Sequence, residues 1–160
     1  ARPFVGESSM FVLLGDNLFG DSLRKPADAF KQDTCEGMVL LTSVPNPREF
    51  GIARFDGSAG QVVEIIEKPS NPPTDLAVTG AYFYRPAVFD LIGQIAPSDR
   101  GELEITDLNN MLIERGSLEW DDVAGWWGDA GTPSGMLRAA NLVAERGVNG
   151  DPPAGDASGD

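Results

Sequence analysis

The sequence predicts an α/β domain with a mixed, mostly parallel sheet that helices cover on both faces. Short apolar runs that end in glycine, proline or acidic residues alternate with segments whose apolar residues recur at helical spacing. Two strand-like segments flank a glycine-containing loop, which indicates an inserted β-hairpin. With 160 residues, 41% of them apolar, the chain has the size of one domain and can bury a core.

The first predicted strand, residues 11–17, is a short apolar run followed by Gly15, Asp16 and Asn17. A buried parallel strand delivers such an acid to the edge of an open α/β sheet, where ligands bind. On this stretch alone, the plainer interpretation is favoured, namely a core strand whose Asp16 caps the next turn. Residues 1–10 offer no neighbouring strand for a βαβ unit, so the domain reads as if its N-terminal part were missing.

The other elements follow from local signals. A short helix is expected to begin at Asp21 or Ser22, with Pro26 in its first turn. Further strands are predicted at residues 38–44, at 51–55 and 61–67 as the hairpin, at 76–84 and, more weakly, at 118–123. Helices are predicted after Pro86, from about residue 105 to Gly116, and from Thr132 to Gly147.

The end of the chain divides into three predicted parts. Residues 126–131 are expected to form a turn, and the last helix then carries the apolar set Met136, Ala140 and Val143. From Val148 onward there is no apolar period. Residues 148–160 are therefore predicted to be a disordered acidic tail, and residues 1–147 the domain.

Composition excludes several functions. A formal net charge of −13 argues against nucleic acid and anionic membranes as partners, and is most simply a solvated acidic face, although it would also suit a salt-rich cytoplasm. The absence of histidine excludes Ser-His and Cys-His catalysis. Cys35 is the single cysteine, which fits a reducing compartment. Without an apolar run of spanning length or a signal-peptide pattern, the protein is expected to be soluble and cytoplasmic.

Four polar clusters follow predicted strands or loops, where they could share one edge of the sheet: Asp16-Asn17, Glu67-Lys68-Pro69, Arg100-Gly101-Glu102 and Asp129. Singly, each acid is more typical of a cap or a solvated side chain. Together, two aspartates from separate loops suit Mg²⁺, which takes few carboxylates and keeps several waters. The lysine and arginine suit a phosphate, and Glu67 suits sugar hydroxyls because an ionised carboxylate only accepts hydrogen bonds.

Several segments, in their order along the chain, resemble motifs of the sugar-1-phosphate nucleotidylyltransferases. They are LGDN at 14–17, FGI at 50–52, EKP at 67–69, VTGAYFY at 78–84, RGELEITD at 100–107 and WWGDAGT at 126–132. The resemblance covers nearly everything from Phe4 to about Arg146 and is strongest to the thymidylyltransferases that act on glucose 1-phosphate. It implies a Rossmann-like nucleotidyltransferase domain.

The resemblance also implies roles for individual residues. Asp16 and Asp129 would hold the catalytic Mg²⁺, and Lys68 and Arg100 would hold the phosphate of the sugar 1-phosphate. The remaining substrate-binding positions would be Asn17, Gly51, Glu67, Val78 and Thr79, the last two through their backbone. The implied reaction is Mg²⁺-dependent transfer of a nucleotidyl group from a nucleoside triphosphate, dTTP, to glucose 1-phosphate, giving dTDP-glucose and pyrophosphate.

Departures from the family pattern leave alternatives open. The family's glycine-rich loop and its lysine precede the Gly-Asp-Asn strand, and residues 1–10 hold no counterpart, so the chain alone is expected to bind ligand without turnover. Gly128 stands where lysine or leucine is usual, and Ala130 where threonine is common. The alternatives are a non-catalytic module that binds nucleotide sugars and a fragment that binds nothing. An incomplete sheet would also leave an open edge that favours a homo-oligomer.

Overall fold

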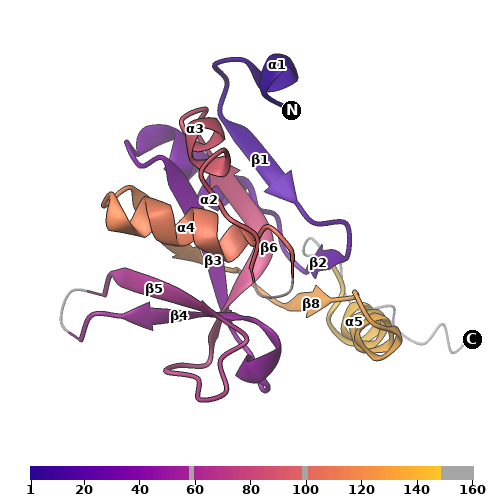
Figure 1. Ribbon diagram of the computed structural model, residues 1–160. Coiled ribbons are helices and arrows are strands. Elements are labelled where there is room, and N and C mark those ends of the chain that lie inside the picture. The colour runs from indigo at the N-terminus through magenta and orange to yellow at the C-terminus, as the bar shows by residue number, and fades with distance from the viewer. Residues whose placement is uncertain (58–59, 99–100, 149–160) are drawn as a thin grey trace, which may run out of the picture.

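The computed structural model describes residues 1–57, 60–98 and 101–148. The main sheet contains the strands β1 (Met10–Leu13), β3 (Gly37–Ser43), β4 (Gly51–Phe55), β5 (Val62–Glu67), β6 (Leu76–Tyr84) and β7 (Leu118–Asp122). A separate ribbon pairs β2 (Asn17–Phe19) with β8 (Trp127–Asp129). The helices are α1 (Arg2–Val5), α2 (Arg24–Gln32), α3 (Val88–Ile92), α4 (Ile105–Glu114) and α5 (Pro133–Arg146), with a short 3-10 helix, η1, at Pro47–Glu49 (Figure 1).

The sheet is mixed and contains the expected hairpin, which confirms the predicted α/β class. Its order is β5-β4-β6-β3-β7, with β1 also paired to β6. The expectation of mostly parallel strands is wrong, because β3 and β7 are the one parallel pair among the described strands. The reason is β6, which lies between β3 and β4 and runs opposite to both.

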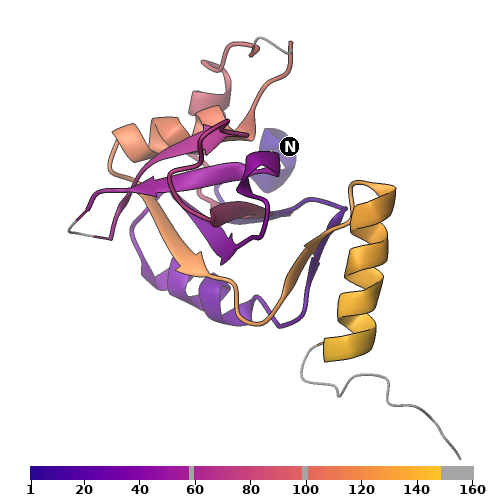
Figure 2. The same cartoon turned by 90° about the horizontal axis from the view of Figure 1, so that it is seen from below.

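Helices cover both faces of the sheet, as predicted. Figure 2 shows α2 and α4 on opposite sides of it. Because side chains alternate along a strand, β6 sends Tyr82 and Tyr84 into one core and Ala81 and Phe83 into the other. The first core is completed by α3 and α4 through Val88, Leu91, Leu108 and Leu112, and the second by α2 through Phe30. A strand buried on both faces reads as a nearly continuous apolar run, as β6 does.

β1 does not match the buried parallel strand predicted at residues 11–17. It is shorter, it runs antiparallel to β6, and it pairs with no other described strand. Met10 and Val12 point toward the first core, whereas Phe11 and Leu13 point to the opposite face of β1. No described helix or strand covers that face, so Phe11 and Leu13 are 45% and 48% exposed. Phe11 still contacts the ring of Phe83, with centroids 4.8 Å apart.

Local corrections concern the helix starts and the region after residue 125. Leu23, rather than Asp21 or Ser22, is the residue before α2 begins, and Pro26 lies in the first turn as predicted. The predicted turn at residues 126–131 contains the short strand β8. α5 has the expected start, with the Thr132 hydroxyl accepting a hydrogen bond from the Gly135 amide at 3.0 Å.

The face by which α5 packs differs from the apolar pattern. Met136 and Val143 are 63% and 36% exposed, whereas Gly135 and Ala139 are buried. Small residues let the helix approach β8 closely, since a side chain at Gly135 would collide with the carbonyl oxygen of Asp129. α5 thus lies beyond the β2–β8 ribbon, apart from the main sheet (Figure 1).

The predicted disordered tail falls, from residue 149 onward, outside the described residues. Within the described part of the chain, no helix combines the length and apolar character needed to cross a membrane. Cys35 is a free, buried cysteine.

Candidate functional site

The β2–β8 ribbon brings Asp16 and Asp129 together from distant parts of the sequence. Asn17 pairs with Asp129 in the ribbon, and the Ala130 amide donates to the Asp16 carbonyl oxygen at 2.7 Å. The two carboxylates face one space: a Cβ built on Gly131 would lie 2.9 Å from Oδ2 of Asp16 and 3.0 Å from Oδ1 of Asp129. The glycine therefore leaves open a small cradle between two acidic oxygens.

Asn17 fixes the ribbon against the main sheet. Its Oδ1 accepts hydrogen bonds from the Gly80 amide at 2.8 Å and from Nε1 of Trp127 at 2.7 Å. Its Nδ2 donates to Oδ1 of Asp16 at 2.9 Å, which orients that carboxylate. Gly80 must be glycine here, because a Cβ would lie 2.5 Å from the Asn17 amide. One side chain thus connects β2, β6 and β8 beside the two acids.

A pocket of about 260 Å³ gathers most of the predicted site residues. Those that line it are Asp16, Asn17, Gly51, Glu67, Lys68, Val78 and Asp129. Thr79 does not line it, because its side chain points to the other face of β6 and is fully buried, with no hydrogen-bond partner for Oγ1 among the described residues. Arg100 lies outside the described residues.

The end of the β4–β5 hairpin supplies Glu67 and Lys68. Gly51 pairs with Glu67 across the hairpin, and the Thr106 hydroxyl donates to Oε2 of Glu67 at 2.8 Å. Lys68 has φ of 43° and is the one non-glycine residue with positive φ in the described part of the chain. Such a backbone is costly and persists where the surroundings hold it, here where the Lys68 amide donates to the Phe50 carbonyl at 3.0 Å. A carboxylate and an ammonium group therefore share one wall of the pocket.

Sequence reasoning missed several lining residues, among them Glu104, Tyr82, Thr106, Asn109 and Trp127. Tyr82 lies two residues from Gly80 on one strand, so strand alternation places both on the face of Val78. Thr106 and Asn109 are three apart on α4 and both are buried. Polar residues on the buried face of an amphipathic helix were the signal that could have found them.

Tyr82 contributes a phenol to the lining of this pocket. Burial raises the pKa of its phenol, and the neighbouring carboxylates of Glu67 and Asp16 raise it further. The hydroxyl therefore stays protonated at neutral pH. Tyr82 adds a neutral hydroxyl to a pocket that also contains carboxylates and the ammonium group of Lys68.

The acids suit a metal that needs few protein ligands. In the described part of the chain, no group of three or more histidine, cysteine, aspartate or glutamate residues could hold a metal ion. The Asp16–Asp129 pair could hold one only if water or a ligand completed the shell, as Mg²⁺ allows and structural zinc sites do not. The donor set fits a hard divalent cation.

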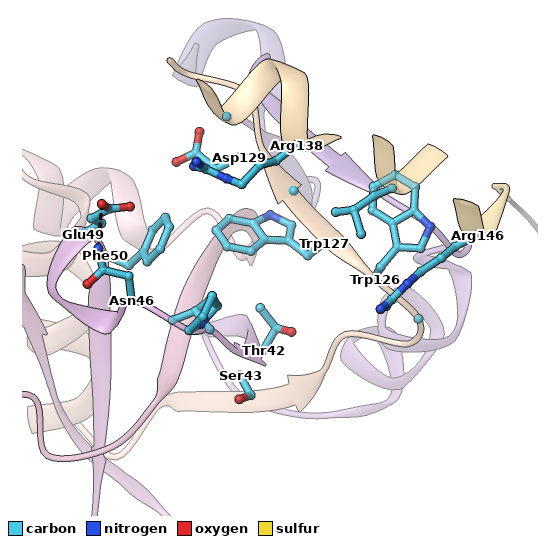
Figure 3. Close-up of a pocket in the computed structure, with 16 residues that line it drawn as sticks. Thr42, Ser43, Asn46, Glu49, Phe50, Trp126, Trp127, Asp129, Arg138 and Arg146 are labelled. Carbon is cyan, nitrogen blue, oxygen red and sulfur yellow. Dashed lines mark hydrogen bonds between the residues drawn. The ribbon is translucent and has the colours of Figure 1, made fainter. Parts of the chain in front are cut away.

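A second cavity adjoins the first (Figure 3). It measures about 590 Å³ and lies between the segment after β3 and the β8–α5 region, with Arg138 and Arg146 in its lining. Glu49, Phe50, Trp127 and Asp129 line both cavities, and Phe50 and Trp127 are both aromatic. The two rings meet edge to face, with centroids 5.3 Å apart. The two cavities therefore meet beside the Phe50–Trp127 pair and beside Asp129.

Comparison with known proteins gives a consistent result. Residues 1–146 match the nucleotidyl transferase family. A low-salt glycan biosynthesis nucleotidyltransferase of Haloferax volcanii, Agl11, is 43% identical over 146 residues, which are 91% of this chain and 41% of that protein. Glucose-1-phosphate thymidylyltransferases of Streptomyces griseus and Xanthomonas campestris are 38% and 40% identical, and the matches cover 91% and 89% of this chain. They cover 41% and 49% of those enzymes, so the chain spans less than half the length of these relatives.

Solved structures have the same fold. A Bacillus anthracis protein assigned as a glucose-1-phosphate thymidylyltransferase, in complex with sucrose, matches with a TM-score of 0.81 and 44% identity. The match covers 88% of this chain and 56% of that one. A UDP-glucose pyrophosphorylase complexed with UDP-glucose matches with a TM-score of 0.79 over 88% of this chain and 58% of that one. At 22% identity, this second likeness concerns the fold alone.

Proposed function

The chain belongs to the nucleotidyl transferase family, and from this membership and the pocket we propose that the protein transfers a nucleotidyl group to a sugar 1-phosphate. The specific reaction is transfer from dTTP to glucose 1-phosphate, giving dTDP-glucose and pyrophosphate. Relatives named glucose-1-phosphate thymidylyltransferase support this choice of substrates. The observation that carries the proposal is the convergence of Asp16 and Asp129 in a pocket that also contains Glu67 and Lys68.

Asp16 and Asp129 would hold Mg²⁺ in the cradle beside Gly131. When bound, the metal would neutralise charge on the phosphate groups of two anionic reactants. Asn17 acts here as a positioning residue, because its Nδ2 holds the Asp16 carboxylate. The chain's own contribution is thus an oriented pair of acceptors.

The hairpin wall would bind the sugar 1-phosphate. Glu67, held at Oε2 by the Thr106 hydroxyl, would accept hydrogen bonds from sugar hydroxyls, and Lys68 would attract the phosphate. Gly51 leaves space for the sugar beside the carboxylate of Glu67, since a Cβ at position 51 would lie 3.2 Å from Oε2 of Glu67. The backbone at Val78 would complete the sugar pocket, with that of Thr79 next to it in β6, and Arg100 would add a second cation for the phosphate.

In the proposed reaction, an oxygen of the sugar phosphate attacks the α-phosphorus of the triphosphate in line, and pyrophosphate leaves. Such a step needs positioning and charge neutralisation more than acid-base groups. A chain without histidine, with a pocket of carboxylates, a lysine and neutral donors, meets these needs.

Isothermal titration of the chain with dTDP-glucose tests the proposal. We expect binding in the presence of Mg²⁺, and an affinity lower by about tenfold or more after chelation by EDTA, because the acids would then face the diphosphate without a counter-charge. Glu67→Gln should weaken binding of dTDP-glucose and leave that of dTDP unchanged. Absence of heat at millimolar dTDP-glucose with Mg²⁺ would contradict the proposal.

A further inference from the structure

Asn109 is a buried polar residue that the roles proposed above do not use. It lies on α4, one turn after Thr106, and is 1% exposed. Its side chain nevertheless lines the pocket that contains Glu67 and the two aspartates. An amide in such a place needs partners, because a buried donor left without a hydrogen bond is destabilising.

Tyr84 is the hydrogen-bond partner of the oxygen of this amide. Its hydroxyl donates to Oδ1 of Asn109 at 2.7 Å. Burial raises the pKa of Tyr84, so the phenol keeps the proton that this bond requires. The ring of Tyr84 is itself held in the core, stacked on Tyr82 at a centroid distance of 5.9 Å. The hydrogen bond from Tyr84 therefore fixes the orientation of the Asn109 amide.

Among the described residues, the nitrogen of the Asn109 amide has no hydrogen-bond partner. Oδ1 is taken by Tyr84, Nδ2 donates no hydrogen bond to any described residue, and the residue lines the pocket. The described core thus presents an N–H donor to the pocket at a position that is almost completely buried.

We propose that Asn109 is a sugar-contacting residue that donates a hydrogen bond from Nδ2 to a hydroxyl oxygen in the innermost part of the pocket. This inference rests on the proposed function. A hydroxyl that donates its proton to Glu67 keeps lone pairs for a second donor, and a carboxylate cannot supply one. A carboxylate acceptor and an amide donor on one pocket discriminate in favour of hydroxylated ligands, because an analogue without the hydroxyl leaves the buried donor unpaired.

A matched pair of variants isolates the donor. Tyr84→Phe removes the phenol oxygen and keeps Nδ2, whereas Tyr84→Phe/Asn109→Leu removes both polar partners. Replacing both partners by apolar groups of similar shape is close to neutral for stability, so the double variant is expected to fold. Asn109→Asp is a second test, since it keeps the shape and the acceptor for Tyr84 and, in its ionised form, lacks the donor. Each protein is titrated with Mg²⁺ and dTDP-glucose, and then with its monodeoxy-sugar analogues.

We expect Tyr84→Phe, which loosens the amide but keeps Nδ2, to bind dTDP-glucose more tightly than the double variant, and we expect the double variant and Asn109→Asp to bind it about tenfold or more weakly than the wild-type chain. For the monodeoxy analogue that lacks the hydroxyl contacted by Asn109, Tyr84→Phe and the double variant should bind with the same affinity. The role of Asn109 would be overturned if the double variant, relative to Tyr84→Phe, lost the same affinity for every analogue as for dTDP-glucose, or lost none. A wild-type chain that binds no sugar nucleotide would instead overturn the proposed function, and this inference with it.

Discussion

At the scale of single residues, the missing side chain of Gly131 matters as much as the carboxylates beside it. The cradle exists because nothing occupies the position that lies about 3 Å from an oxygen of Asp16 and an oxygen of Asp129. A methyl group there would fill the position proposed for the metal ion and would keep both acids. This gives a test that leaves the charge of the site intact.

Gly131→Ala should therefore reduce Mg²⁺-dependent binding of dTDP-glucose by about tenfold or more, because the Cβ would fill the cradle between the carboxylates. Calorimetry with and without EDTA measures this effect. Gly57→Ala is the matched control, since a Cβ there would meet no atom within 4 Å. Wild-type affinity and wild-type dependence on Mg²⁺ in Gly131→Ala would show that the cradle is not the metal site.

Cys35 illustrates how burial controls the chemistry of one side chain. Burial, and then the nearby carboxylate of Asp33, raise the pKa of its thiol to about 12. Because the thiolate is the reactive form, we expect iodoacetamide at pH 8 to modify the folded chain far more slowly than the chain in urea, as followed by mass spectrometry. Equal rates in both conditions would refute this expectation.

At the scale of elements, the site depends on how the β2–β8 ribbon docks on β6. Asn17 makes that connection through bonds to Gly80, Trp127 and Asp16. Asn110 has a comparable structural role at another place, where its side chain bonds to both the amide and the carbonyl of Ile65 on β5. These two asparagines allow stability and binding to be separated.

Asn17→Ala should lower the free energy of unfolding by about 2–4 kcal/mol, because it leaves a backbone amide and an indole N–H without their acceptor. It should also weaken binding of dTDP-glucose, since Asp16 loses its orienting partner. Asn110→Ala should destabilise the chain by about 1–3 kcal/mol and leave ligand affinity unchanged. Urea unfolding and calorimetry give both quantities. Equal affinity in Asn17→Ala and Asn110→Ala would contradict the positioning role.

The elements also show what local sequence patterns specify and what they do not. Residues 51–55, 76–84 and the start of α5 were predicted closely, because alternation, turn glycines and the Thr132-Pro133 cap are local signals. Strand direction and the exposure of β1 depend on which strands become neighbours, which spacing alone does not specify. The packing face of α5 was missed for the same reason, since Gly135 faces β8 because it is small.

For the site, residue types and motif resemblance predicted seven residues of the pocket's lining, including both aspartates, Glu67 and Lys68. The resemblance did not predict the supporting contacts. Thr106 and Asn109 reach the pocket only because α4 packs against the hairpin and β6, as their bonds to Glu67 and Tyr84 show. Such contacts join segments far apart in the sequence and became visible only in the folded chain.

At the scale of the whole molecule, the pocket is assembled from both ends of the described chain. Asp16 just before β2 and Asp129 in β8 supply the aspartates, the end of the hairpin supplies Glu67 and Lys68, and β6 and α4 add further lining residues. An acidic chain of net charge −13 must bind anionic ligands against its own field, so a cation held by the aspartates is central to the account.

Paramagnetic broadening by Mn²⁺ in place of Mg²⁺ tests that claim most directly. In amide NMR spectra of the chain with dTDP-glucose, we predict that sub-stoichiometric Mn²⁺ first broadens the signals of residues 16, 17 and 129–131. Asp129→Asn should abolish this selectivity. Broadening centred elsewhere on the chain, or unchanged in Asp129→Asn, would contradict the account.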